Sequence, residues 1–283
     1  MKIAITSDSV CDLSKEQIKQ NNIKILPLTI NLGDDSFSDG VDITPAKIFE
    51  YVEKNKQLPK TSALNEFAYD EFFEEVLKEY DGIVHFTISS EISSCYNNCV
   101  RSATKHNNVY VIDSKNLSTG VGLLVMYACS LRDNNEKIEN IVKKVTERIP
   151  CVQASFVVER LDYLHKGGRC STIQLLGANI LKIRPSILVK NGKMDMHKKY
   201  RGKMKDVVSE YVKDTLNEFN NYDDSLCFIT YSSATPEMLE SARKALQENA
   251  HFKNIVETTA GATVTSHCGE NTLGILYFSN DKI

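Results

Sequence analysis

Residues 82–113 read GIVHFTISSEISSCYNNCVRSATKHNNVYVID, and this stretch decides the fold class. It predicts a strand over Gly82–Ile88, a serine-rich turn, a helix from about Cys95 to His106, and a second strand over Val109–Asp113. Parallel strands need a long crossover between them, usually a helix, whereas a tight turn joins antiparallel strands. The stretch therefore predicts a parallel sheet with covering helices, an α/β architecture.

The same alternation continues on both sides of this stretch. A serine N-cap and a Thr-Pro pair mark two of the expected helix starts. In the first half we expect strands over Ile3–Ser7 and Ile23–Leu32, and helices over Ser14–Asn21, Thr44 to about Lys54, Glu66–Tyr80, Ser118–Arg132 and Glu136–Ile149.

The order and spacing of the predicted strands and helices change near Pro150, with no low-complexity linker to mark the change. We therefore expect two closely packed α/β domains, residues 1–150 and residues 151–283, with a ligand cleft between them. In the second half we expect strands over Cys151–Glu159, Ile183–Val189, Leu226–Tyr231, Ile255–Thr259 and Gly274–Phe278, and helices over Lys203–Phe219 and after Thr235-Pro236.

Composition excludes several classes of function. Lysine plus arginine number 34 and aspartate plus glutamate 37, and the resulting net charge of −3 lacks the cationic excess that nucleic-acid binding needs. The longest nearly apolar stretch, Gly120–Cys129, is too short for a membrane span. Polar residues at Thr6–Asp8 interrupt any signal-peptide core, so we expect a cytoplasmic protein.

The 8 cysteines are scattered and form no CxxC pair. Scattered cysteines in a cytoplasmic chain are typical of reduced thiols that pack as small hydrophobes. We therefore expect neither disulfides nor a zinc site, and no metal ligands are assigned.

Hydroxyl side chains gather where predicted strands lead into helices, at residues 6–9, at Thr61-Ser62, at Ser89-Ser90 and at Ser93-Ser94. In parallel sheets, ligands bind beyond the carboxyl ends of the strands, and helix N-termini attract anions. Each hydroxyl alone is also an ordinary N-cap. Only if they converge do they predict a site for a carboxylate or a phosphate.

Three further residues could contact an anion. His267 lies in ATVTSHCGENTLG (262–274) between two predicted strands, where it could donate a hydrogen bond or serve as a general base. Arg169 and Arg201 carry the guanidinium that matches carboxylate or phosphate geometry. The chain contains no P-loop and no GxSxG motif.

Several segments together resemble the DegV family in order and spacing, over nearly the whole chain. The family consists of bacterial fatty-acid-binding proteins, and its characterised FakB members supply bound acyl chains to a fatty acid kinase. The resemblance implies two unlike α/β domains, the first with a parallel sheet and the second with a mixed sheet. The segments are KIAITSDSVCDL (2–13), PKTSALNEF (59–67), TISSEISSCYNNCVRSA (87–103), VIDSKNLSTGVGLLV (111–125), YLHKGGRCS (163–171), LLGANILKIRPSILVKNGKM (175–194) and TVTSHCGENTLGILYF (263–278).

The resemblance also implies which residues bind the ligand. The carboxylate-binding pair of the family matches Thr61 and Ser62, its serine at the next helix start matches Ser93, and its C-terminal histidine matches His267. Arg201 matches an arginine that presents the head group to the kinase. Arg169 and the Asp8-Ser9 pair match motifs to which we assign a structural or pocket-lining role.

This chain departs from the family pattern at four positions. Asn65 stands where the family usually has a serine, and Ser94 replaces the usual glycine and adds a hydroxyl beside the acid site. Cys95 and Cys268 are also atypical neighbours of this site. These departures bear on head-group geometry and chain preference more than on the class of ligand.

We expect a carrier without enzymatic activity or cofactor, whose ligand is a long-chain fatty acid. Its expected partners are a fatty acid kinase and, transiently, a membrane, into which free fatty acids also partition. Two alternatives remain open. One is a serine hydrolase of acyl esters with Ser93 or Ser9 activated by His267, and the other is a binding module for a phosphorylated metabolite.

Overall fold

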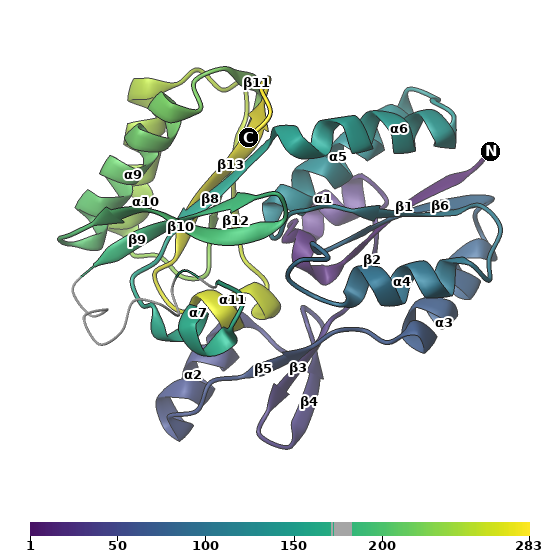
Figure 1. The fold of residues 1–283 in the computed structure, drawn as a ribbon, viewed down its shortest axis with the longest axis horizontal. Coiled ribbons are helices and arrows are strands. Elements are labelled where there is room, and N and C mark those ends of the chain that lie inside the picture. The colour runs from purple at the N-terminus through teal and green to yellow at the C-terminus, as the bar shows by residue number, and fades with distance from the viewer. Residues whose placement is uncertain (171, 173–182) are drawn as a thin grey trace.

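The computed structural model describes residues 1–170, 172 and 183–283 and begins with a four-stranded parallel sheet (Figure 1). Its strand order is β2-β1-β6-β7. Every residue of β1 and β6 is buried, as expected for a parallel sheet covered by helices on both faces. The bounds are β1 (Ile3–Asp8), β2 (Lys24–Leu26), β6 (Gly82–Thr87) and β7 (Val109–Asp113).

A second sheet has six strands in the order β10-β9-β8-β13-β11-β12. β11 and β12 pair in parallel and the other neighbours pair antiparallel, so this sheet is mixed. The predicted fold class, with a parallel sheet early in the chain and a mixed sheet later, is confirmed. The bounds are β8 (Val152–Val157), β9 (Arg184–Lys190), β10 (Lys193–Tyr200), β11 (Tyr222–Tyr231), β12 (Ile255–Thr259) and β13 (Leu273–Ser279).

Helix α5 (Thr119–Asp133) lies between the two large sheets and contacts β1 and β6 as well as β8 and β13 (Figure 1). It contains the apolar stretch Gly120–Cys129, whose composition suits a helix that is buried on most sides. The remaining helices are α1 (Lys15–Gln20), α2 (Pro45–Asn55), α3 (Glu66–Leu77), α4 (Cys95–Ala103), α6 (Ile138–Arg148), α7 (Asp162–Gly167), α9 (Met204–Glu218), α10 (Pro236–Asn249) and α11 (Ala262–Cys268), with 3-10 turns η1 (Ser9–Cys11) and η2 (Ile149–Cys151).

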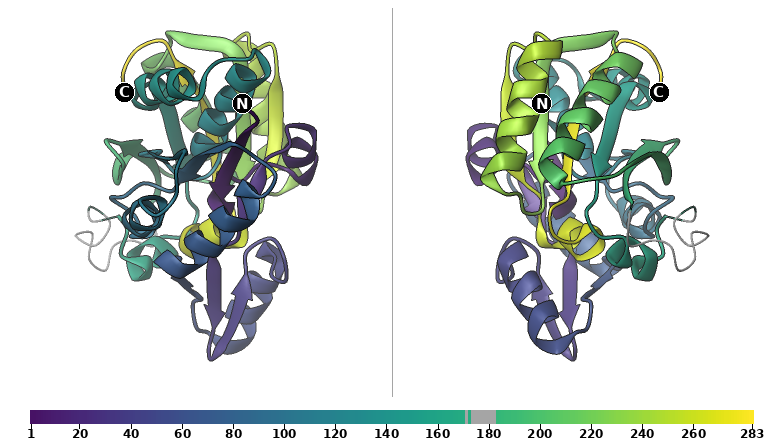
Figure 2. Two further views of the ribbon diagram at one scale, coloured as in Figure 1. Left: turned by 90° about the vertical axis from the view of Figure 1, so that its right-hand side faces the viewer. Right: turned by 90° about the vertical axis from the view of Figure 1, so that its left-hand side faces the viewer.

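A small antiparallel sheet and α2 form a lobe at the bottom of Figures 1 and 2. The sheet has the order β4-β3-β5, with β3 (Thr29–Leu32) in the centre between β4 (Asp35–Ser38) and β5 (Lys60–Ser62). The register pairs Ile30 with Thr61. Helix α11 packs against this lobe through α2, β3 and β5.

The predicted single strand over Ile23–Leu32 is wrong. The chain leaves the parallel sheet after Leu26 and enters the small sheet at Thr29, so that β2 and β3 belong to different sheets. Pro27 stands at the break, and proline has no backbone N–H to donate to a strand ladder.

Several short elements were not predicted. β10 is an edge strand in which half of the residues are lysine or aspartate, and natural sheets use such charges to block edge pairing. β5, α7 and α11 have three, six and seven residues, too few for a periodic pattern. Residues 175–182 of the family segment at 175–194 lie outside the described residues.

Candidate functional site

A cavity of about 450 Å³ lies between the first and second halves of the chain. Its lining combines polar and apolar side chains. One group of lining residues is polar and comprises Thr61, Ser62, Ser93, Ser94, Arg169 and His267. A second group is apolar and comprises Leu28, Ile88, Leu117, Met194, Val264 and Cys268. Of the hydroxyl groups singled out in the sequence, Thr61-Ser62, Ser90 and Ser93-Ser94 line this cavity together with His267, whereas Ser89 and residues 6–9 do not.

Thr61 and His267 meet although they are 206 positions apart in the sequence. The antiparallel pairing of β5 with β3 positions Thr61, and α11 carries His267. The distance from Thr61 Oγ1 to His267 Nε2 is 2.7 Å. This contact joins the small sheet to the second half of the chain at the cavity wall.

The surroundings of His267 define its tautomer. Its Nδ1 is buried without a hydrogen-bond partner among the described residues, and a Cβ added at Gly167 would lie 2.6 Å from it. An unpaired buried N–H is rarer in proteins than an unpaired acceptor. We therefore assign the proton to Nε2, which donates to Thr61 Oγ1. The Thr61 hydroxyl is then free to donate its own proton to a ligand in the cavity.

His267 does not supply the positive charge of the site. Burial, with a smaller contribution from the Arg169 cation, lowers the pKa of His267 to about 4, so its imidazole is neutral at pH 7. Arg169 is exposed, lines the cavity, and donates through Nη1 to the Gly167 carbonyl at 2.6 Å. The guanidinium of Arg169 is therefore a cation beside a set of neutral donors.

The lowered pKa of His267 predicts a loss of stability in acid. The unfolded chain takes up this proton near pH 6.5 and the folded chain only near pH 4, so the unfolded state binds more protons between these values. Between pH 7 and pH 4 this group should lower the free energy of unfolding by roughly 2 to 3 kcal/mol. Urea titrations of wild type and His267→Gln across this range measure the difference, and parallel pH profiles would contradict the assignment.

Ser93 and Ser94 stand at the start of α4. Ser93 Oγ accepts the Cys95 N–H at 3.3 Å and donates toward Cys95 Sγ at 3.2 Å. Ser94 is exposed in the N-cap position, and its side chain makes no capping hydrogen bond. Burial raises the pKa of the Cys95 thiol, which keeps it protonated beside the site.

The departure at Asn65 has a structural explanation. Asn65 is the N-cap of α3, and its Oδ1 accepts the Ala68 N–H at 2.9 Å. Asparagine is as good an N-cap as serine. This position therefore serves the helix that follows β5.

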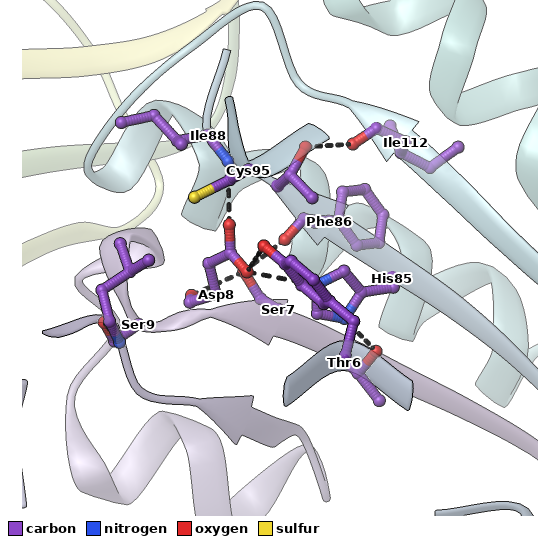
Figure 3. A network of polar contacts seen from close by, with 12 residues as sticks. Thr6, Ser7, Asp8, Ser9, His85, Phe86, Ile88, Cys95 and Ile112 are labelled. Atoms are coloured by element: carbon purple, nitrogen blue, oxygen red, sulfur yellow. Dashed lines mark hydrogen bonds and ion pairs between the residues drawn. The ribbon is translucent and has the colours of Figure 1, made fainter. Parts of the chain in front are cut away.

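A buried polar network joins the end of β1 to β6 (Figure 3). Asp8, at the end of β1, is fully buried, and its Oδ1 accepts from the Tyr69 hydroxyl at 2.9 Å and lies 3.2 Å from His85 Nε2. His85 Nδ1 contacts Thr6 Oγ1 at 2.8 Å. Asp8 Oδ2 accepts the Ile88 N–H at 3.4 Å, which ties the end of β6 to β1. Asp8 thus supports the loop that carries the serines and, like Ser9, does not line the cavity.

Arg201 is exposed directly after β10 and is not among the described residues that line the cavity. Sequence reasoning missed Glu91 and Thr263, which do line it. Glu91 lies 3.5 Å from Lys115 and 3.6 Å from Lys193. Thr263 precedes His267 by four residues on α11, a spacing that would have pointed to it had that helix been predicted.

In the part of the chain that the structure describes, no group of three or more histidine, cysteine, aspartate or glutamate side chains could hold a metal ion. Over the same residues, no helix has both the length and the apolar composition needed to cross a bilayer.

Comparisons with known proteins agree with this architecture. The family model described as "Uncharacterised protein, DegV family COG1307" matches residues 2–280. Two DegV domain-containing proteins, from Clostridium acetobutylicum and Caldanaerobacter subterraneus, are 32% and 30% identical to this chain over 280 residues. Each match covers 98% of this chain and 98% of the relative.

Solved structures resemble the whole chain as well. A fatty-acid-binding DegV family protein from Thermus thermophilus has a TM-score of 0.91 and 24% identity, covering 99% of this chain and 100% of the other. A stearic acid-binding protein from Eubacterium ventriosum has a TM-score of 0.85 and 25% identity, covering 98% of both chains. The match over residues 2–280 and the relatives at 30% identity or more lead to one conclusion: this chain belongs to the DegV family.

Proposed function

We propose that this protein binds a long-chain fatty acid in the cavity between its two halves, as a carrier and not as an enzyme. The observation that carries the proposal is the Thr61–His267 contact at a cavity whose lining combines hydrogen-bonding groups with apolar side chains. Relatives with the same fold include proteins that bind fatty acids.

The carboxylate of the ligand is proposed to lie among Thr61, Ser62, Ser93, Ser94 and His267. An ionised carboxylate taken out of water needs hydrogen-bond donors, and hydroxyls together with helix N–H groups provide them. Arg169 adds a cation at the same wall. Glu91 would repel the acid, but Lys115 and Lys193 lie within ion-pair distance of it.

The acyl tail is proposed to follow the apolar wall. About 14 methylenes at roughly 0.8 kcal/mol each give a gross burial free energy of about 11 kcal/mol, before the entropy of association is subtracted. The binding free energy that remains after this subtraction is compatible with dissociation constants between nanomolar and micromolar. A phosphorylated metabolite has no acyl tail, so the apolar lining residues of the cavity would have no ligand group to contact.

The contacts of the serines argue against a hydrolase. Ser9 donates to Asp39 at 3.0 Å and does not line the cavity. Ser93 contacts Cys95, and His267 Nε2 contacts a threonine. Among the described residues, His267 makes no hydrogen bond to a serine, so the pair that would activate a serine nucleophile is not formed.

The proposal extends to the cellular role. The carrier would present its bound acid to a fatty acid kinase in the cytoplasm, with Arg201 on the exposed surface available to contact that enzyme. Division into residues 1–150 and 151–283 is part of the same proposal, because the cavity is lined from both segments. All eight cysteines are buried thiols, in keeping with a reducing compartment.

Solvent extraction of the purified protein, followed by mass spectrometry, tests the proposal. Long-chain fatty acid is expected in the extract at close to one molecule per chain. A delipidated sample should bind added palmitate, and phosphorylated sugars should leave its Tm unchanged. Absence of lipid together with failure to bind palmitate or oleate would overturn the proposal, whereas labelling by a fluorophosphonate would favour the hydrolase.

A further inference from the structure

Two buried carboxylates from the first half of the chain meet the start of α11, which belongs to the second half. Asp39 Oδ1 accepts the Ala262 N–H at 2.8 Å, and its Oδ2 accepts the Thr263 N–H at 3.2 Å. Asp12 Oδ1 accepts the Gly261 N–H at 2.8 Å. Three successive N–H groups at the helix start thus donate to side chains more than 220 positions away. We call Asp12 and Asp39 the carboxylate pair.

Each member of the carboxylate pair is itself held in place. Asp39 Oδ2 accepts from Ser9 Oγ at 3.0 Å, and Ser9 Oγ accepts the Leu28 N–H at 3.1 Å. Asp12 Oδ2 accepts from Ser118 Oγ at 2.5 Å. The pair is therefore fixed to η1, to the connection between β2 and β3, and to the residue before α5.

Both side chains are almost inaccessible, with exposed fractions of 5% for Asp12 and 3% for Asp39. Burial raises the pKa of Asp12 to about 8, and the nearby Asp39 adds to the rise. A buried acceptor at a helix start satisfies N–H groups that the helix cannot satisfy itself.

The hydrogen bonds from the start of α11 to the carboxylate pair matter because this helix is only seven residues long. His267 follows Thr263 by four residues, about one helical turn. A shift at the start of the helix therefore moves His267 by a similar distance. The partner of His267, Thr61, lies on β5 in the half of the chain that supplies the carboxylate pair.

We propose that Asp39, with Asp12, is a positioning residue for the acid site, holding α11 where His267 Nε2 reaches Thr61 Oγ1. The inference rests on the proposed function, since it concerns recognition of the carboxylate in the same cavity. It predicts that loss of the carboxylate pair weakens binding of an acid more than binding of the same tail without the acid.

Gly261 offers a second way to disturb the pair without removing a charge. A Cβ at this position would lie 3.0 Å from Asp12 Oδ1 and 3.2 Å from both carboxylate oxygens of Asp39. The backbone at Gly261 has φ −64° and ψ 172°, which any residue adopts, so alanine causes no backbone strain. Gly261→Ala therefore displaces the carboxylates through contact alone.

The experiment compares Asp39→Asn and Gly261→Ala with a matched control, Thr235→Ala. Thr235 Oγ1 accepts the Met238 N–H at 3.3 Å as the N-cap of α10, and it does not line the cavity, so its loss removes a cap of the same kind elsewhere. For each variant, the Tm and the dissociation constants for palmitate and hexadecan-1-ol are measured. Long-range ¹⁵N NMR reports the tautomer of His267 in the delipidated protein.

Asp39→Asn is expected to weaken palmitate binding by about tenfold, the effect of one hydrogen bond to a charged group, and hexadecan-1-ol binding by less than threefold. Gly261→Ala should shift both constants in the same directions. In a His267→Ala background, Asp39→Asn should have no further effect on palmitate. Thr235→Ala should lower the Tm and leave both dissociation constants unchanged.

Equal losses for the acid and the alcohol, or additive effects in the His267→Ala background, would overturn the positioning role. If Asp39→Asn fails to fold, Gly261→Ala decides by the same criteria. If the wild type binds neither ligand, the proposed function is wrong, and NMR judges the positioning role alone. A change from the Nε2-H tautomer in Asp39→Asn then supports it, and an unchanged tautomer overturns it.

Discussion

Replacing Thr61 with valine is expected to weaken the binding of palmitate by about 10- to 100-fold. The substitution removes the hydroxyl that we propose donates to the ligand carboxylate, and hydrogen bonds to charged groups contribute about 1.5–3 kcal/mol. It also leaves the Nε2–H of His267 without its partner at 2.7 Å. Isothermal titration calorimetry at pH 7 with delipidated protein measures the change.

Thr61→Ser is the matched control, because it keeps the hydroxyl and loses only a methyl group. Its affinity for palmitate should stay within about threefold of wild type. If His267 acts on the acid through Thr61, as we propose, His267→Ala should add little to Thr61→Val in a double-mutant cycle. An unchanged dissociation constant for Thr61→Val would show that the acid head group does not lie at this wall.

The sequence predicts the composition of this wall but not its contacts. Thr61, Ser62, Ser93 and His267 were assigned through the family resemblance, and all four line one cavity. The hydrogen bond between Thr61 and His267 could not be foreseen, because β5 and α11 are too short to leave a periodic signal.

Asp39 shows the same limit more clearly. In sequence it stands before Gly40, and an Asp-Gly pair predicts no more than a turn. Only the tertiary fold brings its carboxylate to N–H groups more than 220 positions away. The break of the expected strand at Pro27, in contrast, can be predicted from the sequence, because proline is poorly tolerated inside a strand.

We propose that the acyl tail extends beyond the main cavity through a junction with a second cavity. A second, smaller cavity of about 30 Å³ shares Leu117, Val264 and Cys268 with the first. Its remaining apolar lining includes Phe156 and Leu276 on the six-stranded sheet. On this proposal, a tail that fills the main cavity passes these three residues to reach the sheet.

Val264→Phe is expected to close this junction and to weaken palmitate binding by about 100-fold, with less than a threefold change for decanoate. Excluding about four methylenes at roughly 0.8 kcal/mol each costs about 3 kcal/mol, which corresponds to that ratio. Decanoate is six carbons shorter than palmitate, so we expect its tail to end before the junction. Competition with a fluorescent fatty acid measures both constants.

Val264→Ala is the control with the opposite expected effect, because its smaller side chain widens the junction between the two cavities. It should leave decanoate unaffected and improve the affinity for stearate relative to palmitate. Equal losses for palmitate and decanoate in Val264→Phe would mean that the substitution disturbs the acid end, since Val264 precedes His267 by three residues on α11. No loss for either acid would mean that the tail leaves the cavity by another route, and the chain-length limit would then have to lie elsewhere along the apolar wall.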